Sequence, residues 1–112
     1  MSHGVIDVLE EYKLEGKILL TGQDAAVRMC RYIVRYGNSM TVYKPLKQEA
    51  EQAAVLAMKC AKNETTKVTQ VVSNGTVEVP SILIQPIIVD KDNMRKTVVA
   101  DQFVSEASIY GN

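Results

Sequence analysis

Strand-like and helix-like segments alternate along the first half of this 112-residue chain. Residues 17–22 contain the apolar run Ile-Leu-Leu, and residues 40–44 begin with the β-forming stretch Met-Thr-Val-Tyr. Helical spacing of apolar side chains fills the segment between them, where Gly37-Asn38 predicts a left-handed end of the helix, and it recurs over residues 46–62. Strands that alternate with helices favour a parallel sheet, because each crossover carries a helix. We therefore predict an α/β fold with a partial doubly wound, Rossmann-like parallel sheet, in which segment 17–22 is buried on both faces.

The remaining segments complete the expected order of elements. A helix over residues 4–12 precedes the first strand, and the helix over 46–62 carries an alanine-rich stripe that we expect to pack on the sheet. The second half predicts a hairpin at Asn74-Gly75, a strand over 81–85 between two prolines, a further extended stretch and a short helix from about residue 91. We expect two segments in the whole, one over residues 1–89 and a carboxyl-terminal helix and tail at 90–112.

Two charged residues follow the two predicted parallel strands. Asp24 comes after the first strand and is also a natural N-cap for the next helix, while Lys44 closes the second strand. In open α/β sheets, ligands bind in the crevice outside the carboxyl ends of the strands. One acceptor and one donor facing a common crevice suit a polar, hydroxyl-rich small molecule. The alternative for Asp24 is a purely structural cap, and for Lys44 a solvated lysine.

The composition narrows the possible functions. The charges of thirteen basic and thirteen acidic residues cancel, so the chain has no net positive charge that would attract nucleic acid. The chain starts without the basic and apolar regions of a signal peptide, and it shows no catalytic set, phosphate-binding loop or cofactor motif. We expect a binding protein rather than an enzyme, with no metal and no cofactor. Cys30 and Cys60 lie at apolar positions of helices and predict buried free thiols.

Several stretches resemble one protein family. They are Leu14–Ala25 with its Gly-Gln-Asp-Ala motif, Met40–Pro45 with Thr-Val-Tyr-Lys-Pro, Val79–Ile84, Asp90–Asn93 and the terminal Tyr110–Asn112. In this order they are similar to the carboxyl-terminal portion of the D-xylose-binding proteins of bacterial ABC transporters, which are type I periplasmic sugar-binding proteins. The resemblance covers nearly the whole chain, whereas a full family member is far longer.

The resemblance implies a function and a site. It implies a two-lobed fold that binds a pentose such as D-xylose between its lobes and delivers it to an ABC permease outside the cytoplasm. The aspartate of Gly-Gln-Asp and the lysine of Thr-Val-Tyr-Lys-Pro would contact sugar hydroxyls, and these are Asp24 and Lys44 here. Residues 1–89 would be a partial carboxyl-terminal sugar-binding lobe that includes the hinge strand. The tail at 90–112 would pack on the amino-terminal lobe, which this sequence does not contain.

A second hypothesis is structural. A truncated or split-gene lobe would act by self-association into a homo-oligomer, with residues 80–112 docking on another copy, or would form part of a sugar sensor. A sheet with an exposed edge and an apolar face invites such pairing. An independent small enzyme with flavodoxin-like architecture is the least supported reading.

Overall fold

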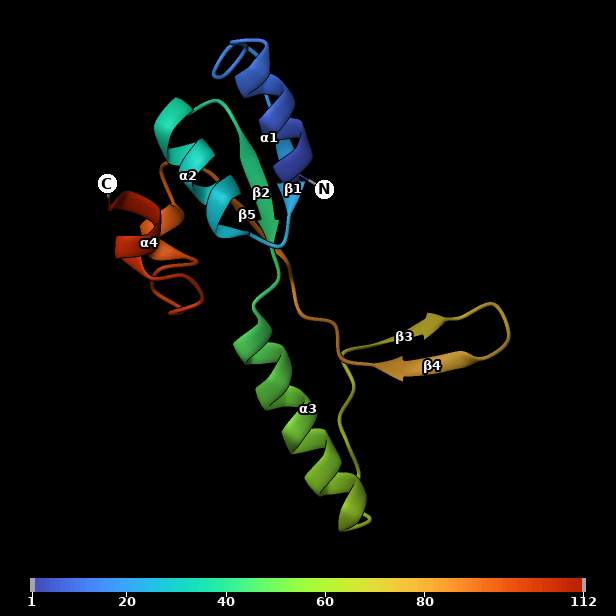
Figure 1. Cartoon of the computed structure of the whole chain (residues 1–112). Helices are drawn as coiled ribbons and strands as arrows, with labels where there is room; N and C mark the ends of the chain where they lie inside the picture. The colour runs from blue at the N-terminus through green and yellow to red at the C-terminus, as the bar shows by residue number, and fades with distance from the viewer. Residues whose placement is uncertain (1, 112) are drawn as a thin grey trace. The chain divides into compact units, whose positions relative to one another are not determined.

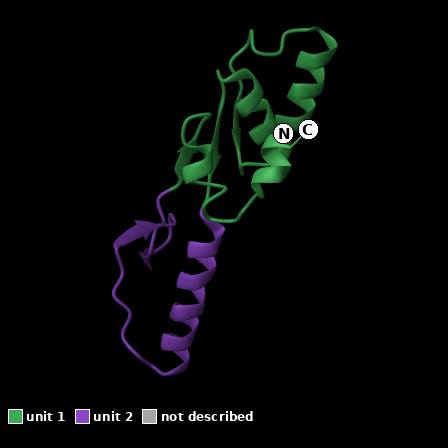
Figure 2. Cartoon of the chain, turned by 90° about the vertical axis from the view of Figure 1, so that its left-hand side faces the viewer, with its two compact units in different colours: residues 1–44, 86–112 green, residues 45–85 purple. Residues whose placement is uncertain are grey.

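The computed structural model describes residues 2–111 and divides the chain into two compact units (Figure 2). The first unit combines both ends of the chain, up to Lys44 and from Pro86 onward. The second unit is Pro45–Gln85. The division into segments 1–89 and 90–112 stays a prediction. In the structure, the tail contributes Met94, Val98 and Ile109 to the core of the first unit.

The first unit is built on a three-stranded sheet (Figure 1). Its strands are β1 (Thr21–Gln23), β2 (Met40–Tyr43) and β5 (Ile87–Val89), in the spatial order β1-β2-β5. β1 and β2 are parallel, with Gln23 opposite Val42, as the alternating pattern predicts. β5 runs antiparallel to β2, with Ile87 opposite Tyr43, so the α/β fold is confirmed with a small mixed sheet.

The outer position of β1 explains one wrong expectation. The predicted strand over 17–22 begins only at Thr21, and it is not buried on both faces. Leu20 is buried, but the side chains of Ile18 and Leu19 are 45% and 65% exposed. β1 has a neighbour on one side only within the sheet of residues 2–111, so one flank of this segment faces solvent.

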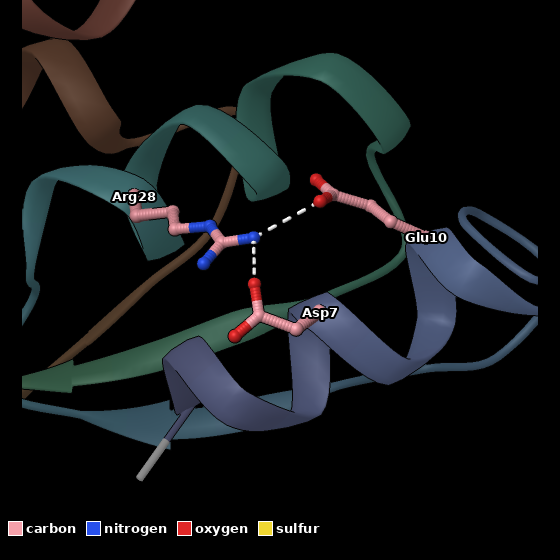
Figure 3. Close-up of polar contacts among 3 residues, drawn as sticks. All are labelled: Asp7, Glu10 and Arg28. Atoms are coloured by element: carbon pink, nitrogen blue, oxygen red, sulfur yellow. Dashed lines mark hydrogen bonds and ion pairs between the residues drawn. The ribbon is translucent and has the colours of Figure 1, made fainter.

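Two helices pack together beside the sheet. α1 (Ser2–Glu11) buries Ile6 and Leu9, and α2 (Val27–Tyr36) buries Met29, Cys30, Tyr32 and Ile33. α2 ends at Gly37, whose φ of 76° is the left-handed stop that the Gly-Asn pair predicts. Arg28 on α2 contacts Asp7 of α1 at 2.5 Å and Glu10 at 3.0 Å (Figure 3). The hydrogen bond to Asp7 raises the pKa of Arg28, which keeps the guanidinium group charged. The arginine therefore links α2 to α1 through two ion pairs.

The tail adds structure that the sequence pattern missed. A 3-10 turn, η1 (Met94–Lys96), replaces the short helix expected from about residue 91, and α4 (Glu106–Tyr110) follows. α4 begins at Ser105, whose Oγ accepts a hydrogen bond from the backbone N–H of Ser108 at 3.1 Å. Arg31 of α2 donates from Nε to the carbonyl oxygen of Ser108 at 2.6 Å, which ties the tail to α2.

The second unit contains a helix and a hairpin. α3 (Leu46–Ala61) forms where the sequence predicts it, and β3 (Gln70–Ser73) pairs antiparallel with β4 (Glu78–Ser81) around the Asn-Gly turn. Of the strand predicted over 81–85, only Ser81 belongs to a strand, as the last residue of β4, and residues 82–85 are irregular. Every residue from 46 to 85 is described, and none of them is buried.

This unit contains two corrections to the expected core. The alanine-rich stripe of α3 is exposed instead of covered by the sheet, and Cys60 on the same helix is an exposed thiol. Only Cys30, in α2, is buried as expected. The helix predicted from the apolar spacing was therefore correct, but that spacing did not reveal whether anything covers the apolar face of the helix.

Candidate functional site

The two strand ends bring Asp24 and Lys44 together at one edge of the sheet. β1 ends at Gln23 and β2 at Tyr43, and the parallel register places the residues that follow them side by side. Lys44 donates from Nζ to Oδ1 of Asp24 at 2.7 Å. The two side chains are 47% and 69% exposed, so both are accessible from solvent. An ion pair this exposed contributes only about 0–1 kcal/mol to stability.

Asp24 does not cap α2, contrary to the structural alternative. The residue before the helix is Ala26, and no side chain caps it. Asp24 and Ala25 instead adopt left-handed backbone conformations, with φ values of 72° and 45°. This conformation costs a residue with a Cβ atom roughly 1 kcal/mol or more, and outliers of this kind cluster at functional sites. The turn directs the carboxylate toward Lys44 rather than toward the helix.

Neighbouring groups hold this turn in place. The backbone N–H of Asp24 donates to the carbonyl oxygen of Val42 at 2.8 Å. The N–H of Ala25 donates to Oγ1 of Thr41 at 3.3 Å, in a fully buried contact. The thiol of Cys30 donates to the carbonyl oxygen of Ala25 at 3.2 Å. Thr41 was not singled out by the sequence, because its role depends on the register between β1 and β2.

Replacing Thr41 by valine tests the role of this acceptor. Thr41→Val keeps the shape but leaves the buried N–H of Ala25 without a partner, which costs about 1–3 kcal/mol. We expect the free energy of unfolding to fall by that amount in a urea titration. Thr41→Ser keeps the acceptor and serves as the matched variant. A valine variant as stable as wild type would show that this hydrogen bond contributes nothing.

A groove adjoins one member of the pair. It has a volume of about 510 Å³ and extends along β1, from the amino-terminal part of α1 to Asp24. Its lining residues are Ser2, Val5, Leu20, Thr21, Gly22, Gln23, Asp24, Met40 and Val42. Lys44 is not among them. The groove thus offers the carboxylate of Asp24, the backbone of β1 and a few apolar side chains.

The middle of the tail contacts the last residue of the second strand. The ring of Tyr43 is buried beside Phe103, with the ring centroids 5.1 Å apart. The hydroxyl group of Tyr43 donates to Oδ2 of Asp101 at 3.2 Å. Neither Asp101 nor Phe103 was recognisable from the sequence, because each lies about 60 positions from Tyr43 along the chain. These contacts fix the backbone immediately before Lys44.

The side chains at this strand edge are hydrogen-bonding groups. A carboxylate and an ammonium group at a strand edge can accept and donate hydrogen bonds to hydroxyl groups. The nearby thiol of Cys30 is fully buried, and burial raises its pKa to about 11, so it is not an activated nucleophile. Among the residues that the structure describes, no group of three His, Cys, Asp or Glu side chains could hold a metal ion. In the same part of the chain, no helix is long and apolar enough to cross a membrane.

The fold matches part of the solved structures of solute-binding proteins. A carbohydrate transporter solute-binding protein from Chloroflexus aurantiacus, solved with D-glucose, matches 83% of this chain and 27% of its own length with a TM-score of 0.74 and 26% identity. An ABC transporter solute-binding protein from Clostridium phytofermentans, solved with β-D-glucose, shares the fold with a TM-score of 0.71 and 23% identity. The α/β architecture is therefore that of one part of such proteins.

Proteins related in sequence identify a more specific group of binding proteins. The chain is homologous to the D-xylose-binding periplasmic protein of Haemophilus influenzae, with 40% identity over 96% of the chain. The protein of the same name from Escherichia coli is 36% identical over 95% of the chain. The chain spans 32% of the length of each of these relatives. No family model matches it. The homology confirms the resemblance noted in the sequence, and both relatives are named as binding proteins, as expected.

Proposed function

We propose that this chain forms part of an extracytoplasmic sugar-binding protein of an ABC transporter and supplies one wall of a pentose site. The observation that carries the proposal is the 40% identity with a D-xylose-binding periplasmic protein over 96% of the chain. Asp24 would accept hydrogen bonds from sugar hydroxyls, and Lys44 would donate them. Charge-assisted hydrogen bonds of this kind contribute roughly 1.5–3 kcal/mol each. In the complete protein, the loaded form would deliver the sugar to an ABC permease.

The exposure of the pair supports only a partial site. Ligand pockets normally bury most of the ligand surface, whereas the side chain of Asp24 is 69% exposed. We therefore expect little or no sugar binding by the isolated chain, and binding when a second wall is present. The match covers 32% of the length of the Haemophilus influenzae relative, and the second wall would lie in the remaining part of such a protein.

A chimera tests the proposal. The matching third of the Haemophilus influenzae protein is replaced by this chain, and D-xylose binding is measured by isothermal titration calorimetry. We expect the chimera to bind, the isolated chain to give no signal below about millimolar sugar, and Asp24→Ala or Lys44→Met to weaken the chimera by roughly tenfold to a hundredfold.

Matched variants keep this test specific. Asp92→Ala and Lys47→Met remove exposed charges of the same kinds elsewhere and should leave the affinity unchanged. Thermal unfolding followed by circular dichroism confirms that each chimera is folded. Micromolar binding by the isolated chain would contradict the proposal that it supplies only one wall of the site. Full affinity in the Asp24→Ala chimera would show that Asp24 does not contact the sugar.

We propose self-association as a second candidate function, because residues 46–85 lack a buried core. A chain of this kind would act as a homo-oligomer or as part of a sugar sensor. One relative has a name that suits the sensor hypothesis. It is the multiple sugar-binding periplasmic receptor ChvE of Rhizobium radiobacter, which is 29% identical over 72% of this chain. Docking of the tail on another copy is less favoured, since Met94, Val98 and Ile109 are buried within their own chain.

A further inference from the structure

A groove lies between α1 and α2, on the side of α2 that carries its arginines. Its volume is about 620 Å³. Arg28, Arg31 and Arg35 line it at intervals of three and four residues, which places them along one side of the helix. The rings of Tyr32 and Tyr36, whose centroids are 4.7 Å apart, belong to the same lining. The groove therefore combines cationic and aromatic side chains.

The first of these arginines is neutralised within the fold. Arg28 forms ion pairs with Asp7 and Glu10 of α1 (Figure 3). Glu10 is the one carboxylate among the described residues that line the groove. Arg35 lies two turns further along α2, about 10 Å from Arg28 along the helix axis. This separation exceeds the Debye length of about 8 Å at physiological ionic strength, so the two carboxylates do not neutralise Arg35.

The other two arginines are held in position without a carboxylate partner. Within residues 2–111, no ion pair includes Arg31 or Arg35. Arg31 donates from Nε to the carbonyl oxygen of Ser108 at 2.6 Å, and the guanidinium carbon of Arg35 lies 5.4 Å from the ring centroid of Tyr36. A guanidinium group has five N–H donors, so both arginines keep further donors for a ligand. Because these contacts already restrict the two side chains, binding would cost less side-chain entropy.

The spacing of the two arginines indicates the shape of a suitable ligand. Arg31 and Arg35 are four residues apart, which corresponds to about 6 Å along the helix axis. Alternate side chains of an extended peptide point to the same face and are about 6.6 Å apart. Carboxylates bind guanidinium groups through charge-assisted, often bidentate hydrogen bonds. Two acidic residues at alternate positions of an extended peptide therefore match the two arginines, and the tyrosine rings offer an apolar surface beside them.

We propose that the groove between α1 and α2 is a docking site for an extended acidic segment of a partner protein. Arg31 and Arg35 would each bind one carboxylate of that segment, and the ring of Tyr36 would contact the peptide beside them. The inference goes beyond the proposed function, because the groove contains neither Asp24 nor Lys44. Loss of docking would therefore leave the sugar-binding prediction unchanged.

Fluorescence anisotropy tests the docking with the full chain and a labelled peptide of sequence Ser-Glu-Ser-Glu-Ser-Glu. We expect saturable binding that weakens as sodium chloride is raised to physiological ionic strength, because the contacts are between exposed charges. The same peptide with glutamine in place of glutamate should not bind. Absence of saturable binding of the acidic peptide at low salt would refute the proposal.

Arginine variants locate the binding. Arg31→Gln and Arg35→Gln should each weaken the affinity roughly tenfold, since each removes a charge-assisted hydrogen bond. Arg95→Gln removes the same charge outside the groove and should leave the affinity within about twofold. Arg31 also holds the tail through Ser108, so Arg35→Gln is the decisive variant, with circular dichroism to confirm its fold. Equal weakening by Arg95→Gln would show that the peptide senses only the overall charge and would overturn the assignment to this groove.

Inorganic phosphate distinguishes a peptide from a small anion. Phosphate should displace the labelled peptide only as much as sodium chloride of equal ionic strength does. Much stronger displacement would mean that the arginines form a small-anion site and would overturn the peptide assignment. Sedimentation equilibrium of the unlabelled chain separates this docking from self-association, and a strict monomer at high concentration would contradict only the second candidate function.

Discussion

Replacing Ile33 by alanine should destabilise the first unit by about 2–5 kcal/mol, the largest effect that we expect from a single substitution. Ile33 is fully buried on α2, in the same core as Met29, Val89 and Val98. Removing three carbon atoms there loses transfer free energy and leaves a cavity that close-packed neighbours fill only in part. Urea unfolding followed by circular dichroism measures the loss. The core is small, so such a change removes much of the stability of a domain of this size.

The matched control is Val8→Ala on α1. Val8 belongs to the same unit, but its side chain is 51% exposed. Surface substitutions of this kind usually change stability by less than about 0.5 kcal/mol. Equal losses in the two variants would mean that α2 does not form the centre of the core.

The second large effect depends on pH. Burial raises the pKa of the Cys30 thiol to about 11 in the folded chain, from a reference value of 9.0. The fold therefore favours the neutral thiol. Below about pH 8 the thiol is essentially neutral in both states and the stabilisation is complete. As the pH rises from about 9 to 11, the unfolded chain ionises first, so the free energy of unfolding should fall by at most about 3 kcal/mol.

Urea titrations between pH 7.5 and 11 measure this decline. Tyrosines and lysines also ionise in this range, so the comparison with variants isolates the thiol. Cys60→Ser keeps Cys30 and should show the full decline, whereas Cys30→Ala should lose the part that belongs to the thiol. A Cys30→Ala chain with the same pH profile as wild type would rule out this origin.

Local patterns in the sequence were sufficient for most of the elements. The helical spacing of α2 and α3, the left-handed stop at Gly37 and the Asn-Gly hairpin are each properties of a few neighbouring residues. α4 was missed because it has only five residues, too few to show a period, and its cap at Ser105 resembles ordinary loop sequence. β5 was read as extended, but its antiparallel direction depends on where the chain re-enters the sheet after residues 45–85.

The candidate site was predictable in part for the same reason. Parallel strands end at a common edge, so a residue after each strand must lie near the other, and the 2.7 Å contact of Asp24 with Lys44 agrees with that geometry. The role of these residues in sugar binding stays a prediction. The cap assigned to Asp24 was wrong because the chain inserts two left-handed residues before α2. That turn is supported by Thr41 and Cys30, which are remote in the sequence.

The sequence by itself determined the order of the elements, the α/β class and the placement of Asp24 and Lys44 at the strand ends, because each follows from periodicity and turn chemistry over short distances. Only the tertiary structure decided which apolar faces are covered. The tail completes the core around α2, whereas the alanine-rich stripe of α3 stays exposed. Burial is a property of contacts between distant segments, and the period of a helix records only which face could be covered.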